Sequence, residues 1–117
     1  MNEKLKNKIF LKENYAEILL EHKTYGRAVA KVDIEDLQKI KDLKWGLVVN
    51  KKLCTLYVGH SNKGEMIYLH RFITKCPDGL VVDHINHDTL DNRKTNLKVC
   101  SCYENAQNRI YYNKRGA

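Results

Sequence analysis

The sequence lacks the long apolar runs of membrane and secreted proteins. None of its 117 residues belongs to an apolar stretch long enough to cross a bilayer. The first residues contain no apolar signal-peptide core. The chain also holds a single proline, no internal repeat and no low-complexity tract. These absences favour a cytoplasmic protein with no membrane partner, and the length fits one domain.

Cysteines are few and widely spaced. Of the four, Cys54 and Cys76 are isolated, and only Cys100 and Cys102 lie close together. The sequence therefore lacks the two C-x-x-C pairs of many structural zinc sites. Without a secretion signal the thiols are expected to stay reduced. We expect buried, unpaired cysteines and no structural zinc.

Positive charge is what the sequence has in excess. Lysine and arginine number 21 against 14 aspartates and glutamates, which gives a net charge of +7. The excess gathers at the two ends of the chain, as in a core flanked by basic arms. Basic side chains near phosphates release condensed counterions, so a nucleic acid is a suitable partner. Charge alone leaves open an anionic membrane surface or no polyanionic partner at all.

The apolar patterning predicts a small α+β protein. Short apolar and alternating runs between turn residues predict strands over 15–21, 27–32, 46–50, 53–58, 65–69, 80–82 and 97–100. Helices are predicted over 33–43, over 70–75 and from Ser101. Asp33 with Asp36, and Ser101 with Glu104, have the spacing of capping boxes, and Trp45 is the expected core anchor. The chain thus has a leader of small antiparallel strands and a helix, followed by a C-terminal ββα unit.

The stretch from Asp83 to Asn105 carries the chemistry. Asp83 and His84 directly follow the apolar run 80–82, so they lie at the end of a strand, where neighbouring side chains point to opposite faces. A carboxylate suits Mg²⁺, and a neutral imidazole suits a general base. Phosphodiester hydrolysis needs both. Asn105, on the first turns of the last helix, can add a neutral oxygen, although the Asp-His pair alone would also fit a structural salt pair.

These residues resemble the HNH endonuclease family. The resemblance rests on Val82-Asp83-His84, Asn96-Leu97 and Glu104-Asn105-x-x-Asn108-Arg109. The third letter of the motif is asparagine, as in the phage and intron homing branch, which Leu69-His70-Arg71 and Leu90-Asp91-Asn92-Arg93 also resemble. The clear match covers about residues 66–109.

The resemblance implies a role for each motif residue. His84 would be the general base, and Asn96 would brace the loop that aims it. Asp83 and Asn105 would hold the metal, and the neutral oxygen of Asn105 favours Mg²⁺ or Mn²⁺ over zinc. The residues expected to contact DNA are His70, Arg71, Arg93, Asn108 and Arg109.

Three of the polar residues have open alternatives. His70 could equally be a structural histidine in a packed corner. Arg93 could form an internal ion pair with Asp91 instead of reaching the DNA backbone. His87 is expected to be exposed, with a place near the site as the alternative.

The resemblance also implies an organisation and an activity. Residues 1–65 would be a leader packed on the nuclease core, 66–110 the HNH ββα-metal motif and 111–117 a basic tail, all within one globular domain. The expected activity is metal-dependent hydrolysis of double-stranded DNA, nicking one strand, by a monomer or weak dimer without a small-molecule cofactor. The alternative is a non-catalytic DNA-binding module that retains the fold. A phage or mobile element in a bacterial host would encode it, as a minimal or trimmed nuclease with weak sequence preference.

Overall fold

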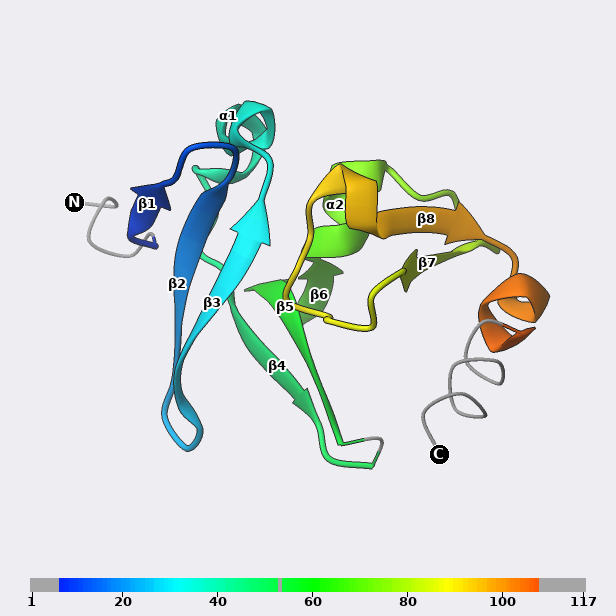
Figure 1. The fold of residues 1–117 in the computed structure, drawn as a ribbon. Coiled ribbons are helices and arrows are strands. Elements are labelled where there is room, and N and C mark those ends of the chain that lie inside the picture. The colour runs from blue at the N-terminus through cyan, green and yellow to red at the C-terminus, as the bar shows by residue number, and fades with distance from the viewer. Residues whose placement is uncertain (1–6, 53, 108–117) are drawn as a thin grey trace.

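The computed structural model describes residues 7–52 and 54–107 of the chain (Figure 1). The strands are β1 (Ile9–Leu11), β2 (Ala16–His22), β3 (Gly26–Val32), β4 (Gly46–Asn50), β5 (Thr55–Asn62), β6 (Glu65–Tyr68), β7 (Val81–His84) and β8 (Leu97–Cys100). The α-helices are α1 (Leu37–Ile40) and α2 (Leu69–Thr74), and η2 (Ile34–Asp36) and η3 (Lys94–Asn96) are 3-10 helices. Residues 102–107 are also helical. The predicted α+β class is confirmed.

Within the described part of the chain the strands form three antiparallel sheets, ordered β1-β2-β3, β4-β5-β6 and β7-β8. In β2 every second side chain is buried, namely Ala16, Ile18 and Leu20, because successive residues of a strand face opposite sides of its sheet. Helix α2 packs against strands of both the second and the third sheet. The β7–β8 pair and the helix at 102–107 lie on the opposite side of the molecule from β1 (Figure 1).

Trp45 is the centre of the core, as the sequence predicts. Its side chain is buried, and its indole nitrogen donates a hydrogen bond of 2.8 Å to the carbonyl of Ile40. The rings of Phe72 and His60 pack against it, at 5.6 and 5.8 Å between ring centroids. A tryptophan buries the largest apolar area of any side chain, and its N–H is satisfied here, so this position stabilises the whole N-terminal half.

The helix predicted over 33–43 is present but shorter and less regular, because the 3-10 turn η2 is followed directly by the single turn of α1, which ends at Ile40. Asp33 makes no capping hydrogen bond. Its carboxylate instead accepts one of 2.9 Å from the backbone N–H of Lys94. The fully buried Asp36 faces the Lys94 ammonium at 3.0 Å. At the other end the carbonyl of Ile40 binds the Trp45 indole, which competes with continuation of the helix.

The C-terminal elements agree more closely with the predictions made from the sequence. Strand β8 has the predicted bounds, and the capping box before the last helix is present. The N–H of Ser101 donates to the carboxylate of Glu104 at 3.0 Å, and the N–H of Glu104 donates to the Ser101 hydroxyl at 3.1 Å. Strand β1 was not predicted, because it is a short, exposed edge strand defined by its pairing with β2.

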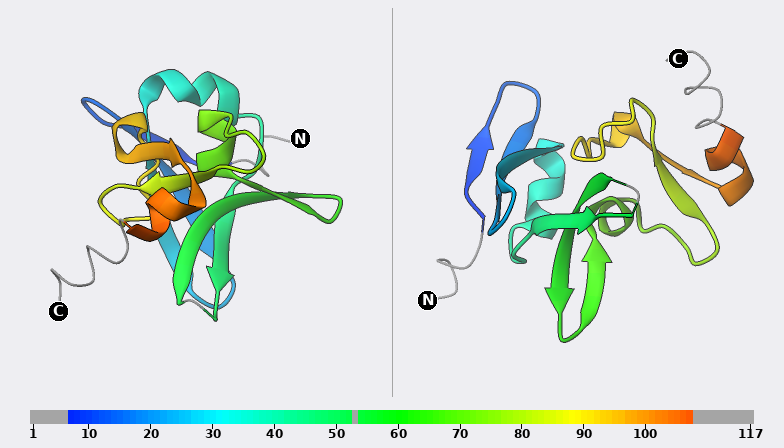
Figure 2. Two further views of the ribbon diagram at one scale, coloured as in Figure 1. Left: turned by 90° about the vertical axis from the view of Figure 1, so that its right-hand side faces the viewer. Right: turned by 90° about the horizontal axis from the view of Figure 1, so that it is seen from below.

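The loop between β7 and β8 lies along the edge of β3. The N–H of Lys31 donates to the carbonyl of Leu90 at 2.9 Å, and the N–H of Asn92 donates to the carbonyl of Lys31 at 2.8 Å. The Thr89 hydroxyl donates to the carbonyl of Leu56 in β5. Figure 2 shows this loop, in yellow, between the N-terminal sheet and the β7–β8 pair. The leader therefore sets the path of the loop that follows Asp83 and His84.

Among the described residues, the helices are too short and too polar for any of them to cross a membrane. The four cysteines do not pair with one another. Cys100 is buried as expected, but Cys54 and Cys102 are exposed, so the expectation of buried thiols is wrong for these two.

Candidate active site

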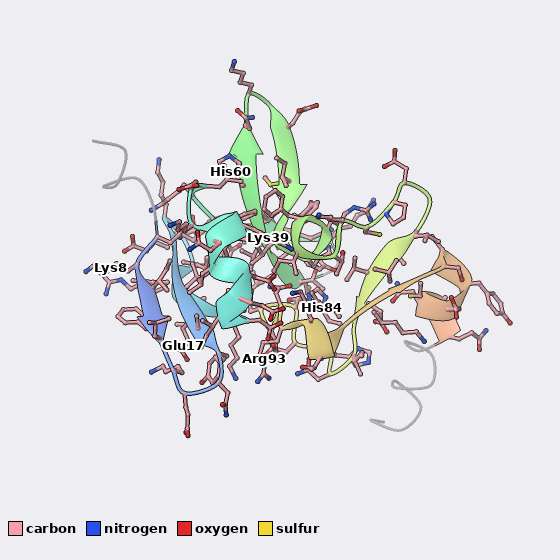
Figure 3. All side chains as sticks on the ribbon, turned by 90° about the horizontal axis from the view of Figure 1, so that it is seen from above. Lys8, Glu17, Lys39, His60, His84 and Arg93 are labelled. Carbon is pink, nitrogen blue, oxygen red and sulfur yellow. The ribbon has the colours of Figure 1, made fainter. Side chains whose placement is uncertain are left out.

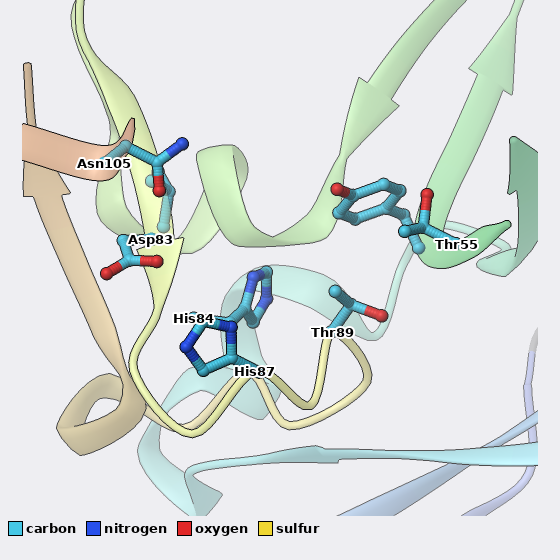
Figure 4. A pocket seen from close by; sticks show the side chains of 8 residues that line it. Thr55, Asp83, His84, His87, Thr89 and Asn105 are labelled. Carbon is cyan, nitrogen blue, oxygen red and sulfur yellow. The ribbon is translucent and has the colours of Figure 1, made fainter. Parts of the chain in front are cut away.

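A pocket of about 150 Å³ opens where β7, the loop after it and the last helix meet. It is lined by Thr55, Tyr57, Val82, Asp83, His84, His87, Thr89 and Asn105. Figure 4 shows Asn105 beside Asp83, with the two imidazoles on the neighbouring strand end and loop. The pocket therefore brings together Asp83, His84 and Asn105, which come from a strand and from a helix 21 or more positions later in the chain.

Asp83 and His84 end strand β7, where they pair in register with Lys98 and Leu97 of β8. Both are nearly buried, with 8% and 6% of their surfaces exposed. Neighbouring strand residues point to opposite faces, yet both line the pocket. The chain turns directly after His84, where the N–H of His87 donates to the His84 carbonyl at 2.9 Å, so the pleat does not continue.

Asn92 holds the imidazole of His84. The Nε2 of His84 lies 2.9 Å from the side-chain oxygen of Asn92, which is completely buried. Because that oxygen can only accept, Nε2 carries the proton of the neutral ring and Nδ1 keeps the lone pair. A base needs that lone pair. The sequence quoted Asn92 within Leu90–Arg93 but gave it no role, since the fold alone brings it to His84.

Burial lowers the pKa of His84, while the hydrogen bond that its ring donates to Asn92 and the carboxylates of Asp83, Asp88 and Asp91 oppose this shift. The net lowering keeps the imidazole neutral at pH 7, the state in which it can take up a proton. Burial, followed by the charges of His84 and Arg71, lowers the pKa of His70 to about 4. Both rings are therefore neutral at physiological pH.

Asn96 ties the two sides of the loop together. Its amide nitrogen donates to the carbonyl of Asp91 at 2.9 Å, and its side-chain oxygen accepts from the N–H of Asn86 at 2.9 Å. Its own carbonyl accepts from the N–H of Ile85, also at 2.9 Å. These hydrogen bonds fix the loop immediately after His84 to the start of β8.

The protein-family comparison matches residues 68–107 to the model of the HNH endonuclease family. Residues 68–107 are therefore similar to HNH endonucleases. Neither the curated proteins nor the solved structures contain a significant match to this chain. The matched segment begins at the end of β6 and includes α2, β7, β8 and the described part of the last helix. Two residues of the pocket, Thr55 and Tyr57, lie before the matched segment.

Many nucleases use divalent metal ions to stabilise the attacking and leaving oxygens. The donors in this HNH pocket are the Asp83 carboxylate and the Asn105 amide, both hard oxygen ligands. Among the residues that the structure describes, no three His, Cys, Asp or Glu side chains form a ready-made metal cluster. The two oxygens nonetheless fit Mg²⁺, which takes one or two protein ligands and completes its shell with water and substrate phosphate.

His70 lies behind His84 in the HNH domain. Only 9% of its surface is exposed, and the two rings meet edge to face with centroids 5.1 Å apart. Tyr68 stacks on the other side, at 5.5 Å between centroids. This placement favours a supporting role for His70. Its contact with DNA stays a prediction.

The two described arginines expected to contact DNA are engaged within the protein. The Arg71 guanidinium donates to the carbonyls of Leu80 and Pro77 at 3.0 and 3.3 Å, and so closes the loop after α2. Arg93 binds both carboxylate oxygens of Asp91, at 2.8 and 2.7 Å. This is the internal ion pair that the sequence offered as the alternative to a DNA contact. Their DNA contacts stay predictions, and Asn108 and Arg109 lie outside the described residues. Figure 3 shows Arg93 and His84 between the N-terminal sheet and the β7–β8 pair.

His87 is the pocket residue that the sequence placed incorrectly. It was expected to be exposed, but it is half-buried and lines the pocket with Asp83. Its φ of 65° is in the left-handed region that favours glycine. The spacing His84-x-x-His87 is the only hint in the sequence, and the turn after β7 is what makes it meaningful.

Proposed function

We propose that this protein is a metal-dependent HNH endonuclease that hydrolyses phosphodiester bonds and nicks one strand of double-stranded DNA. The observation that carries the proposal is the single pocket lined by Asp83, His84 and Asn105 within the segment that matches the HNH model. The neutral His84, with Nδ1 unprotonated, supports it further.

In this proposal His84 is the general base. Its Nδ1 accepts a proton from a water molecule as the water oxygen attacks the phosphorus, the bond from phosphorus to the 3′ oxygen breaks, and the departing 3′ oxygen takes up a proton from solvent. The products are a 5′-phosphate end and a 3′-hydroxyl end. Asn92 keeps the ring in the required tautomer, and it stabilises the imidazolium by accepting from Nε2. Asn96 does not contact the base in this proposal. It positions His84 indirectly, by fixing the path of the loop that follows it.

Asp83 and Asn105 would hold the ion, Mg²⁺ or Mn²⁺, in the same pocket. A bound divalent cation supplies charge compensation for the phosphate and the leaving oxygen. The near-complete burial of Asp83 keeps its carboxylate in a fixed position, which lowers the entropic cost of binding the ion.

The remaining parts of the proposal follow from charge and family likeness. The net charge of +7 supports binding to the DNA backbone, with the contacts of His70, Arg71, Arg93, Asn108 and Arg109 to be tested. One site with one ion cuts one strand in each encounter, in keeping with a monomer or weak dimer. The asparagine at position 105 supports a place in the phage and homing branch, with activity in the cytoplasm of a bacterial host.

The second candidate is a DNA-binding module that keeps the fold without catalysis. The internal pairing of Arg71 and Arg93 does not distinguish the two, whereas the retention of Asp83, His84 and Asn105 in one pocket favours the enzyme. Salt-sensitive DNA binding without cleavage under any divalent ion would favour the module.

Supercoiled plasmid incubated with Mg²⁺ or Mn²⁺ tests the proposal. Wild type should produce nicked circles, and His84→Ala should lose at least about a hundredfold in rate, the contribution of a general base. His22→Ala is the matched control. That histidine lies at the turn between β2 and β3, where its Nδ1 accepts from the N–H of Thr24 at 3.0 Å, and its removal should leave nicking unchanged. Equal rates for His84→Ala and wild type would refute the assignment.

A further inference from the structure

We propose that His87 is a further ligand of the divalent ion, together with Asp83 and Asn105. The inference rests on the proposed function, because it requires the ion site at Asp83. It adds a nitrogen donor to a set that otherwise offers only oxygen. The site would then prefer Mn²⁺ and Co²⁺ more strongly than Asp83 and Asn105 alone would make it.

The turn after β7 brings His87 to the pocket. The hydrogen bond from its N–H to the carbonyl of His84 closes a four-residue turn, which returns the chain toward the strand end. A second local hydrogen bond fixes the chain just after the turn, since the N–H of Asp88 donates to the Asn86 side chain at 2.8 Å. His87 therefore reaches the same pocket as Asp83, four residues earlier, and Asn105, on the helix (Figure 4).

The backbone at position 87 is left-handed, with φ of 65°. Glycine adopts this conformation most easily, and asparagine, aspartate and histidine adopt it more often than other residues. The backbone therefore permits a histidine without requiring one, so the inference rests on the position of the side chain in the pocket.

The chemistry of the pocket assigns the two imidazoles different tasks. His84 binds Asn92 through Nε2 and is needed as the base through Nδ1. His87 is the other imidazole in the pocket, next to one carboxylate and one amide oxygen. Asp83 and His87 supply only two ligands of the usual His, Cys, Asp and Glu types, and Asn105 supplies the third donor. This set is consistent with the lack of a three-membered cluster of those types among the described residues.

Co²⁺ titration of the full chain, without DNA, tests this assignment. The visible absorption of Co²⁺ changes when an imidazole nitrogen replaces water. His87→Gly should weaken Co²⁺ binding at least about tenfold and remove that spectral change. Its melting temperature should be unchanged or higher, because glycine relieves the backbone. In plasmid nicking, the ratio of the Mn²⁺ rate to the Mg²⁺ rate should fall.

Two variants make the result decisive. Lys63→Gly relieves a similar left-handed residue, with φ of 51°, in the turn between β5 and β6, so it should leave Co²⁺ binding unchanged. Asp83→Asn should weaken Co²⁺ binding whether or not His87 is a ligand. Equal Co²⁺ affinity in wild type and His87→Gly, with loss in Asp83→Asn, overturns only the His87 assignment.

Three further outcomes would contradict the His87 assignment or the ion site itself. Unchanged Co²⁺ binding in Asp83→Asn contradicts the ion site itself, and with it the proposed function. No Co²⁺ binding to wild type overturns the His87 assignment. If His87→Gly keeps its Co²⁺ affinity but binds DNA more weakly in EDTA, His87 contacts phosphate and the assignment is also overturned.

Discussion

The hydrogen bond between Asn92 and His84 offers the sharpest test of how the HNH pocket works. Asn92→Ala removes the acceptor that holds Nε2, whereas Asn92→Asp keeps an oxygen in the same place. Asn92 is completely buried and His84 is 6% exposed, so water cannot readily replace the lost partner. The perturbation is therefore confined to the orientation and tautomer of the base.

The magnitude follows from the burial. A buried donor left without a partner costs about 1–3 kcal/mol. If that cost falls on the reactive tautomer, then at about 1.4 kcal/mol per factor of ten the rate should fall roughly 5- to 150-fold. Global stability should fall by less, because the Nδ2 of Asn92 is itself buried without a hydrogen bond, and alanine removes that unpaired donor.

Steady-state nicking kinetics with saturating Mn²⁺ measure the effect. Asn92→Ala should lower kcat with little change in KM, and Asn92→Asp should recover most of the loss. Thermal melting of both variants shows whether they remain folded at the assay temperature. A folded Asn92→Ala protein with wild-type kcat would show that the hydrogen bond does not orient the base.

Three further predictions concern stability and the ion. The pKa of His70 is lowered to about 4, so the unfolded chain binds a proton below pH 6.5 while the folded chain does not. Stability contributed by neutral His70 is therefore lost as pH falls, by at most about 2 kcal/mol at pH 5, and His70→Phe should flatten the decline in melts at pH 7 and 5. Lys94→Met removes the nearer ammonium partner of buried Asp36, at 3.0 Å, and leaves only Lys39 at 3.9 Å, so it should lower the urea midpoint; adding Asp36→Asn should restore part of it, and an unchanged midpoint in the single variant would contradict this. EDTA should abolish nicking and lower the melting temperature only slightly, through loss of the ion bound at Asp83 and Asn105, and Mg²⁺ or Mn²⁺ should restore both; unfolding in EDTA at the assay temperature would instead reveal a structural metal.

The sequence predicts those parts of the molecule whose causes are local. The capping box of Ser101 and Glu104 and the bounds of β8 depend on residues a few positions apart, and both are present. The capping box predicted for the helix at 33–43 is absent, because Asp33 and Asp36 instead interact with Lys94, about sixty residues away. Nothing near Asp33 in the sequence indicates that partner.

The same distinction holds for the candidate site. The motif pointed to Asp83, His84 and Asn105, and they line one pocket, although their roles remain to be tested. It did not identify Asn92 as the partner of His84, because the edge of β3 sets the path of the loop. His87 was misplaced for a similar reason, since its position depends on a turn with a left-handed residue.

The docking of the β7–β8 loop on β3 has a consequence for attempts to move residues 68–107 into another protein. Residues 68–107 alone would carry every letter of the HNH motif but would leave behind Lys31, whose N–H and carbonyl bind the loop at Leu90 and Asn92. They would also lose the carbonyl of Leu56 that holds Thr89. A chimera built from that segment should therefore keep the HNH motif residues but lose the orientation of the His84 imidazole. The exception would be a host protein that presents an unpaired strand edge to the loop at the same place.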